Sequence, residues 1–237
     1  MMLLGTGAVA TKTYVDDVFY THLYTGNGSV SGQTITGSDF TPDFVWIKQR
    51  NGSQNNLLID TTRGINKYLK SDEDEEEATN EDFVTQVLNG GFKVGNSGVT
   101  NGSSETNVGW TWKKSPAFTI CTWTGSGANR LISHDLGSIP GMILVKASGR
   151  QSDWNVYHRG IGNDHYLELN KTSDKQQEGT GGVQTWNNTS PTATTFSLGP
   201  SWDVNKDGID YVAYLFAGGE STAATARSVD FDGSGES

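Results

Sequence analysis

Short apolar runs separated by turn-forming residues are the dominant pattern of this chain. Residues 44–48 read Phe-Val-Trp-Ile-Lys, and nearly every position is apolar. Such a run predicts a central strand in a sheet that is covered on both faces. In residues 108–113, Val-Gly-Trp-Thr-Trp-Lys, large apolar residues alternate with small or polar ones. This period of two predicts a strand with one packed face and one face toward water.

The pattern repeats about every hundred residues. Residues 42–48 return at 140–146 and residues 67–69 return at 165–167, both with an offset of 98. Residues 91–95 return at 195–199 and residues 108–112 at 212–216, with an offset of 104. The repeated features are apolar strand patterns and turn residues, with seven short strands expected in each copy. The sequence therefore predicts an all-β fold of two tandem antiparallel β-sandwich domains, of jelly-roll or lectin-like type.

The repeat also suggests domain boundaries. Residues 1–20 precede it and form an N-terminal arm, and residues 21–116 and 117–218 form the two sandwich modules. Residues 219–237, rich in Gly, Ser, Thr and Ala, are expected to form a flexible C-terminal linker. The arm has two interpretations: a frayed terminus, or a segment that becomes ordered on a partner. The residues that would anchor it are Tyr14, Val15, Val18 and Phe19.

Composition narrows the classes of partner. The 237 residues carry a formal net charge of −10, which disfavours a phosphate backbone, so no nucleic-acid partner is expected. No window approaches the roughly 18 apolar residues of a membrane span, so no membrane insertion is expected. Cys121 is the only cysteine, which excludes an intrachain disulfide, and its apolar surroundings predict a small core residue.

Two acidic segments raise the question of metal binding. Residues 71–78 concentrate carboxylates without turn-forming residues, which predicts a solvated loop or a frayed helical turn. Asp203, Asn205 and Asp207 occupy positions 1, 3 and 5 of half a calcium loop, with glycine at position 6. The twelfth position is Tyr214 and not glutamate, which favours a polar hairpin turn over a calcium site. No other cofactor is expected.

Catalytic patterns are weak in this chain. His158 and His165 flank a glycine-containing segment, but no Gly-x-Ser-x-Gly elbow accompanies them, and structural roles are favoured. A pair of carboxylates for glycoside hydrolysis is defined by distance in space, and the sequence singles out none. We therefore expect no enzymatic activity.

Six of the seven tryptophans fall into two groups. Four align with apolar or aromatic residues of the other copy and are expected in the core: Trp46, Trp110, Trp112 and Trp123. Trp186 and Trp202 lie in loops rich in Asn, Thr, Ser and Pro, where exposed rings can stack on sugars. The alternative is that these two loop tryptophans fold back as lids on the end of a sandwich.

The repeated motifs also resemble a known module. The strings Tyr24–Gly28, Pro42–Lys48, Arg63–Leu69 and Val108–Trp110, with their second-copy counterparts, are similar to a module found in tandem in virion structural proteins of marine tailed bacteriophages. Residues 10–16 look like a short segment of phage tail-fibre proteins. The resemblance covers roughly residues 21–217 and brings no catalytic residues.

This resemblance implies a function. It implies a non-enzymatic component of the phage particle, the virion-attached part of a tail fibre that serves host attachment. It also implies a homotrimer that contacts other virion proteins, such as tail adaptor or nozzle components, after assembly in the host bacterial cytoplasm. The alternatives are a capsid decoration or knob protein, and a lectin-like module that binds a host surface glycan.

Overall fold

The computed structural model describes residues 14–179 and 184–218, and nearly all of its regular structure is β-strand. The first half of the chain contains the 3-10 helix η1 (Val15–Asp17), β1 (Phe19–Thr25), β2 (Gln33–Thr36), β3 (Phe44–Gln49), β4 (Leu57–Asp60), β5 (Lys67–Lys70), β6 (Ala78–Thr79), β7 (Gln86–Leu88), β8 (Gly91–Val94), α1 (Gly98–Asn101) and β9 (Thr106–Trp112). The second half contains β10 (Phe118–Thr124), β11 (Arg130–Ser133), β12 (Pro140–Ala147), β13 (Asn155–His158), β14 (Gly162–Glu168), β15 (Gln176–Gln177), β16 (Thr195–Leu198), α2 (Trp202–Asn205) and β17 (Asp210–Ala217). The chain passes between the halves through residues 113–117.

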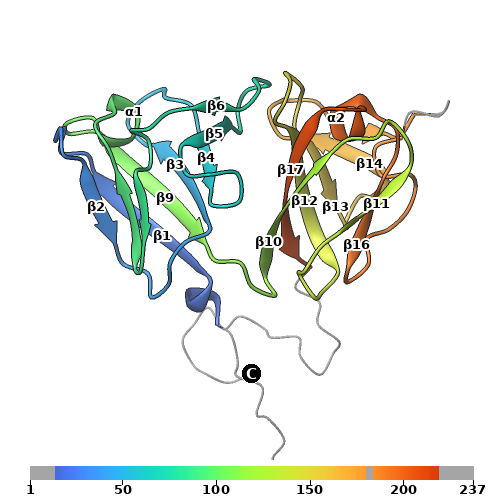
Figure 1. Ribbon diagram of the computed structural model, residues 1–237, viewed down its shortest axis with the longest axis horizontal. Coiled ribbons are helices and arrows are strands. Elements are labelled where there is room, and N and C mark those ends of the chain that lie inside the picture. The colour runs from blue at the N-terminus through green and yellow to red at the C-terminus, as the bar shows by residue number, and fades with distance from the viewer. Residues whose placement is uncertain (1–13, 180–183, 219–237) are drawn as a thin grey trace, which may run out of the picture.

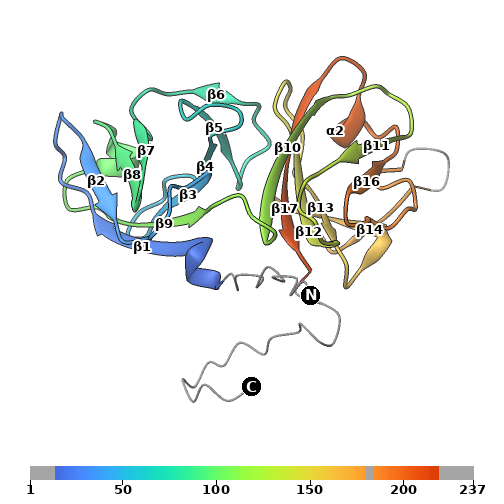
Figure 2. The ribbon, with the colours of Figure 1, turned by 60° about the horizontal axis from the view of Figure 1, so that its bottom comes forward.

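Each half is a sandwich of one large and one small antiparallel sheet. The first half has a sheet in the order β1-β9-β3-β4-β5-β6 and a smaller sheet β2-β8-β7. The second half has a sheet in the order β10-β17-β12-β13-β14-β15 and a smaller sheet β11-β16. The halves lie side by side with α1 and α2 at the same end (Figure 1), and the small sheets lie on opposite outer sides (Figure 2). The predicted all-β antiparallel sandwich fold is confirmed.

Strand pairing places the repeated residues at equivalent positions. Trp46 of β3 pairs with Trp110 of β9, and Leu144 of β12 pairs with Tyr214 of β17. These pairs reproduce the sequence offsets of 98 and 104. The residues that the repeat aligns therefore occupy the same places in the two halves.

A buried asparagine closes the helical end of each sandwich in the same way. Asn101 at the end of α1 accepts a hydrogen bond from the Asn27 amide and donates one to the Gly95 carbonyl, both of 3.0 Å. Asn205 at the end of α2 makes the matching contacts with Ser126 and Gly199, again at 3.0 Å. Because a buried amide must be hydrogen-bonded, each side chain joins two loops that would otherwise leave polar backbone unpaired.

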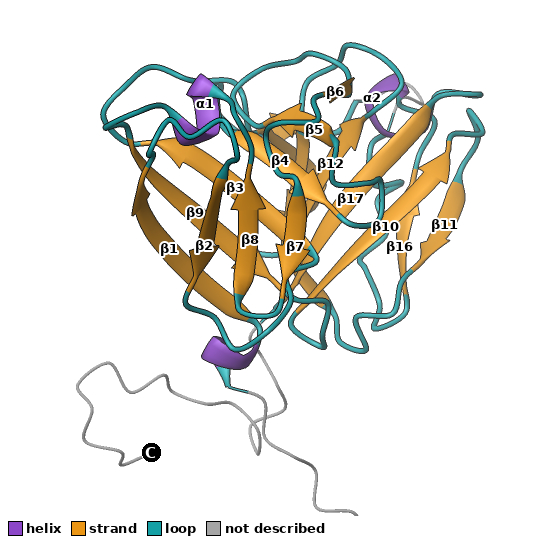
Figure 3. Ribbon diagram, turned by 60° about the vertical axis from the view of Figure 1, so that its left-hand side comes forward, coloured by secondary structure: helices purple, strands orange, loops and turns teal. Residues whose placement is uncertain are grey.

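Each sandwich has its own apolar core between its large and small sheets. Val45 and Ile47 of β3 point into the first core, and their counterparts Ile143 and Val145 of β12 point into the second. Cys121 packs against the second core, as predicted. Figure 3 shows the small sheet β2-β8-β7 in front of the large sheet of the first half.

The prediction that one face of β9 meets water is wrong. Gly109 and Thr111 are buried and face the first core. A Cβ atom at Gly109 would lie 2.8 Å from the ring of Phe92, so glycine admits that ring against the sheet. The small residues of this strand therefore face a neighbouring aromatic ring and not solvent.

A third apolar core lies between the two large sheets. From the first half it contains Phe44, Leu58 and Leu69, and their counterparts Met142, Val156 and Leu167 contribute from the second half. The two large sheets thus pack with the same face toward each other, and the molecule is a stack of four sheets. The prediction that residues 44–48 form a strand covered on both faces is confirmed, and the other half of the chain provides one of the covers.

Aromatic rings make much of this shared core. The ring of Phe44 stacks on Tyr214 at a centroid distance of 4.4 Å and lies 5.5 Å from Phe118. Trp112 meets Phe216 edge-on at 5.9 Å. Rings at these separations contribute packing energy beyond the area they bury, so the two halves form one body.

Candidate functional site

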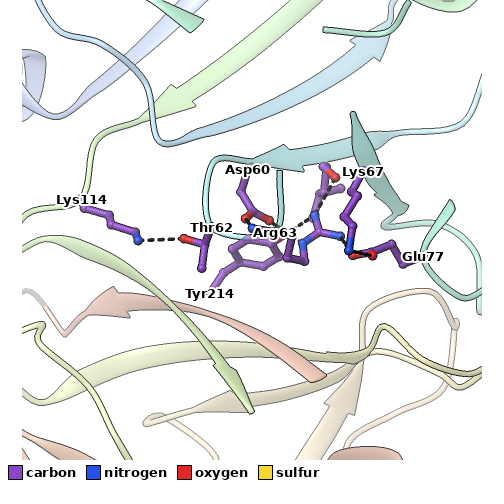
Figure 4. Close-up of polar contacts among 8 residues, drawn as sticks. Asp60, Thr62, Arg63, Lys67, Glu77, Lys114 and Tyr214 are labelled. Atoms are coloured by element: carbon purple, nitrogen blue, oxygen red, sulfur yellow. Dashed lines mark hydrogen bonds and ion pairs between the residues drawn. The ribbon is translucent and has the colours of Figure 1, made fainter. Parts of the chain in front are cut away.

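The junction between the halves also contains a buried polar cluster. The guanidinium of Arg63, with a side chain only 4 % exposed, donates to Oδ2 of Asp60 at 2.6 Å and to Oε2 of Glu77 at 2.9 Å. It also donates to the Tyr214 hydroxyl of the second half at 2.9 Å. Figure 4 shows these groups converging between the two large sheets. The positive charge is balanced by carboxylates, which a buried guanidinium requires.

Local sequence holds Arg63 in this position. Asp60 ends β4, and its Oδ1 accepts a 2.8 Å hydrogen bond from the Arg63 backbone amide. Gly64 follows with φ +115, a conformation that favours glycine, and the chain turns back into β5. At the offset of 98, the places of Asp60 and Arg63 are taken by His158 and Ile161. The Asp60–Arg63 pair therefore has no counterpart in the second half.

Tyr214 completes the cluster from the second half. Its hydroxyl donates to Oδ2 of Asp60 at 2.8 Å. Burial raises the pKa of Tyr214 well above its ordinary value, so the phenol stays neutral and keeps its proton for this bond. No sequence pattern predicts this contact, because Tyr214 and Asp60 are 154 residues apart.

The acidic segment forms a loop, one of the two structures expected for it, and this loop lies against the second half. The Asp74 carbonyl accepts a 2.9 Å hydrogen bond from the Ser152 amide, and its carboxylate accepts one of 3.0 Å from Gln151. The Glu77 amide donates to the Ser148 carbonyl at 3.0 Å. Several carboxylates of the segment remain exposed, but its backbone joins the halves.

A buried lysine faces the same junction. Lys146 of β12 has no exposed surface and donates a 2.8 Å hydrogen bond to the Ala147 carbonyl. Burial lowers the pKa of Lys146 to about 8, and the nearby Asp74 opposes this shift. The carboxylates of the acidic segment thus lie near a lysine ammonium that is shielded from water.

The structure divides the predicted anchoring residues. Tyr14 and Val15 are 53 % and 60 % exposed. Val18 is buried, and Phe19 packs on Trp112 at a centroid distance of 4.9 Å. Only the first two are accessible to a partner, while the other two fasten the segment to the first sandwich. Residues 1–13 of the predicted arm and residues 219–237 of the predicted linker lie outside the described residues.

Trp186 is a core residue, which corrects its assignment as a glycan contact. It is 2 % exposed and meets Tyr157 edge-on at 5.8 Å in the second core. Its backbone amide donates to the buried carboxylate of Glu178 at 3.1 Å, which draws the polar loop over the sandwich. The alternative expectation, a loop tryptophan that folds back, describes Trp186.

Trp202 remains accessible. It is 60 % exposed at the start of α2, and the ammonium of Lys206 lies 4.3 Å from its ring centroid. The first-half counterpart of Trp202 is Gly98. An exposed ring that the repeat does not require is available for contact with a ligand.

Asn205, the central ligand of the candidate calcium loop, is not available to an ion. Asn205 points into the sandwich, and its side-chain oxygen and nitrogen are both used by loop backbone. Asp203 lies on α2 and pairs with Arg150 at 3.5 Å. Within residues 14–179 and 184–218, no group of three or more His, Cys, Asp or Glu side chains is placed to hold a metal ion. The oxygen-rich spacing at 203–207 reflects a capped helical turn that the other half repeats at Asn101.

The four tryptophans expected in the core are buried or half-buried. Trp123 is buried in the second core, and Trp46 and Trp112 pack against the shared core. Trp110 is half-buried and meets Trp46 edge-on at 6.1 Å. None of these rings is presented to solvent in the way that Trp202 is.

The fold and the junction define a protein of paired β-sandwiches joined face to face. The chain belongs to a family described as a domain of unknown function, DUF7483, whose profile matches residues 15–225. Because the match runs through both halves, the family is defined on the pair and not on one sandwich. No curated protein and no solved structure matches the chain. No helix among the described residues is long and apolar enough to cross a membrane.

Proposed function

We propose that this protein is a structural component of a bacteriophage virion, the virion-attached part of a tail fibre that serves host attachment. The observation that carries the proposal is the face-to-face docking of two equivalent sandwiches through Phe44, Leu58 and Leu69 and their counterparts. Docking of this kind makes a compact and stiff body from one chain. Such a body suits a spacer that transmits position and load between a particle and a cell surface.

The character of the repeated residues supports a scaffold over an enzyme. Asn101 and Asn205 are repeated, and both fasten loops. The chemically most capable cluster, around Arg63, is not repeated, and its groups are satisfied by one another. A catalytic constellation needs groups that are left available to a substrate. The groups around Arg63 instead bond to one another across the junction and hold the two halves together.

The exposed residues near the start of the chain suit a contact with other virion proteins. Tyr14 and Val15 are exposed at the start of the 3-10 helix η1, which is fixed to the first sandwich through Val18. Apolar side chains on a firmly held segment are suited to docking on a tail adaptor or nozzle component. Association as a homotrimer would place three such segments together at one end of the fibre.

Locating the protein in intact particles tests this proposal. Purified phage would be imaged by electron cryomicroscopy with and without a bound antibody fragment against this chain, with a fragment against the major capsid protein as the control. Extra density on the tail supports the proposal. Extra density on the capsid surface instead supports the capsid decoration or knob alternative. Absence of the protein from purified particles would overturn both.

A second candidate function is binding of a host surface glycan at Trp202. The observation that favours it is the 60 % exposure of this ring, where the other half has Gly98. One ring face carries the Lys206 ammonium, so a sugar would stack on the other face or displace the lysine. Binding of host polysaccharide would be compared between the native chain and Trp202→Ala. Equal binding by the two proteins would remove this candidate.

A further inference from the structure

A polar groove of about 490 Å³ opens at the junction of the two halves. The residues of the first half that line it include Thr62, Lys67 and Glu77, and those of the second half include Thr122, Thr124 and Asp210. Neither half forms the groove alone, because each contributes one wall. The volume lies within the range of pockets that hold small ligands.

The walls carry both hydrogen-bond donors and acceptors. The Lys67 ammonium donates to Oε1 of Glu77 at 2.9 Å, and an ammonium has three donors. Oδ1 of Asp210 accepts from the Thr124 hydroxyl at 2.6 Å, and a carboxylate has two oxygens. The Thr62 hydroxyl accepts from Lys114 at 2.7 Å and retains its own proton for donation. Each group has capacity left for a ligand.

The charges that line the groove cancel. Arg63 and Lys67 bring two positive charges, and Glu77 and Asp210 bring two negative charges. An anion would meet the two carboxylates, and a cation would meet the ammonium and the guanidinium, so neither is favoured by the groove as a whole. A ligand without net charge meets no such repulsion.

The hydroxyl groups of the groove narrow the class of ligand further. Thr62, Thr122 and Thr124 each offer a hydroxyl, which both donates and accepts. The rings of Trp123 and Tyr211, on the same two strands, turn the other way into the second core, so the hydroxyls of these strands are left to face the groove. Paired donors and acceptors of this kind are complementary to the hydroxyl groups of a sugar.

We propose that the groove between the two halves binds a neutral saccharide through Lys67, Asp210 and the threonine hydroxyls. This inference goes beyond the proposed function, because a fibre component needs no ligand at its junction. It concerns a different place from Trp202. The site exists only in the docked pair, so saccharide binding would report on the arrangement of the halves.

The test is ligand-observed saturation-transfer NMR on the full chain. The probes are maltose, lactose, N,N′-diacetylchitobiose and rhamnose, with glucuronic acid, sulfate and spermidine as charged comparators. Lys67→Met removes a charged donor and is expected to weaken binding of the preferred saccharide about tenfold. Thr122→Val removes one hydroxyl at nearly constant shape and is expected to weaken it about threefold.

Matched controls change the same residue types outside the groove. Lys48→Met alters a lysine that donates to the Gln54 carbonyl, and Thr25→Val alters an exposed threonine at the end of β1. Both are expected to leave the dissociation constant unchanged. Thermal unfolding of every variant would show that the fold is retained, and Thr122→Val, as an exposed and isosteric change, tests the site even where Lys67→Met lowers stability.

Three results would overturn the proposal. The first is that no neutral saccharide of the panel binds, or that a charged comparator binds in preference. The second is that binding is the same in both groove variants as in the native chain. The third is that binding is lost in Trp202→Ala but not in Lys67→Met or Thr122→Val, which would place the saccharide at Trp202 and not in the groove.

Discussion

The hydroxyl of Tyr214 in the second sandwich donates a 2.8 Å hydrogen bond to Oδ2 of Asp60 in the first. Arg63 contacts both partners, so three residues from two halves form one buried network. The network lies at the edge of the aromatic core that Phe44 forms with Tyr214. Polar and apolar contacts therefore fix the same interface.

Tyr214→Phe tests the polar part of this interface. The substitution keeps the ring but leaves Asp60 and Arg63 with an unfilled hydrogen-bond position in a buried site. We expect the free energy of unfolding to fall by about 1–3 kcal/mol, measured by urea denaturation. Tyr68→Phe is the control, because its ring packs on Phe83 within the first sandwich, and its effect should stay within about 0.5 kcal/mol. Equal effects of the two changes would contradict the network.

Because Asn101 and Asn205 make matching hydrogen bonds, we expect their removal to lower the free energy of unfolding by similar amounts. Asn101→Ala and Asn205→Ala each leave loop backbone groups unpaired in a buried place, and each should lower the free energy of unfolding by about 3 kcal/mol. Asn66→Ala, which removes a hydrogen bond to Glu81 in an exposed setting, should cost no more than about 0.5 kcal/mol. A large cost at only one of the two buried positions would contradict their structural equivalence.

The same arrangement predicts that calcium does not stabilise the protein. The side chain of Asn205 is bonded within the sandwich and cannot turn toward an ion without breaking those bonds. Thermal unfolding in calcium chloride and in a chelator should give the same Tm. A rise in Tm that depends on calcium concentration and disappears in Asp203→Asn would restore the calcium loop.

The two loop tryptophans should differ sharply. Trp186→Ala removes a ring that is 2 % exposed and should lower the free energy of unfolding by about 3–5 kcal/mol. Trp202→Ala removes a ring that is 60 % exposed and should change it by no more than about 1 kcal/mol. Urea denaturation of the two variants, monitored by circular dichroism, measures these changes in the free energy of unfolding. Similar losses in the free energy of unfolding for the two variants would contradict the different burial of the two rings.

Lys146 predicts a dependence of stability on pH. Its pKa is about 8 in the folded protein, below the ordinary value of about 10.4. Between these values the unfolded chain binds more protons, so this group makes the free energy of unfolding rise with pH through that window. Below about pH 8 the lysine is protonated in both the folded and the unfolded chain, so the free energy of unfolding is reduced by the full cost of burying the cation. The charged groups around Lys146 are Asp74, Glu76, Arg150 and Asp153.

Comparison with Lys146→Met isolates this effect, because the other titrating groups are shared. Between pH 8 and pH 10 the native chain should gain on the order of 1–3 kcal/mol relative to the variant, measured by urea denaturation. Lys48→Met, at the equivalent position of the first half, is the matched substitution, and the trend assigned to Lys146 should not depend on it. Parallel pH profiles for the native chain and Lys146→Met would contradict a lowered pKa.

Much of the fold could be predicted from the sequence because it rests on local pattern. The run from Phe44 to Lys48 is apolar on both sides, and both sides are covered. Its counterpart in the second half aligns residue for residue, because packing at Trp46 and Leu144 follows the same register. The pattern could not show that the cover on one side is the other half of the chain.

The candidate sites were harder to predict because they depend on distant contacts. Trp186 has polar neighbours in the sequence, yet Glu178 accepts its backbone amide and the ring turns inward. Asp60 and Arg63 stand three residues apart, but Tyr214 comes from the last strand. The acidic run carries strong charge repulsion, and only the backbone bonds of Asp74 and Glu77 to the second half reveal its place.

The most direct test of the account measures whether the two sandwiches share one core. Hydrogen–deuterium exchange by mass spectrometry would be compared between the native chain and Phe44→Ala, a change in the first half that removes a ring stacked on Tyr214. We predict faster exchange in peptides from β3 and β4 and also in peptides from β10 and β17. Faster exchange confined to the first half, with β10 and β17 unchanged, would contradict the shared core.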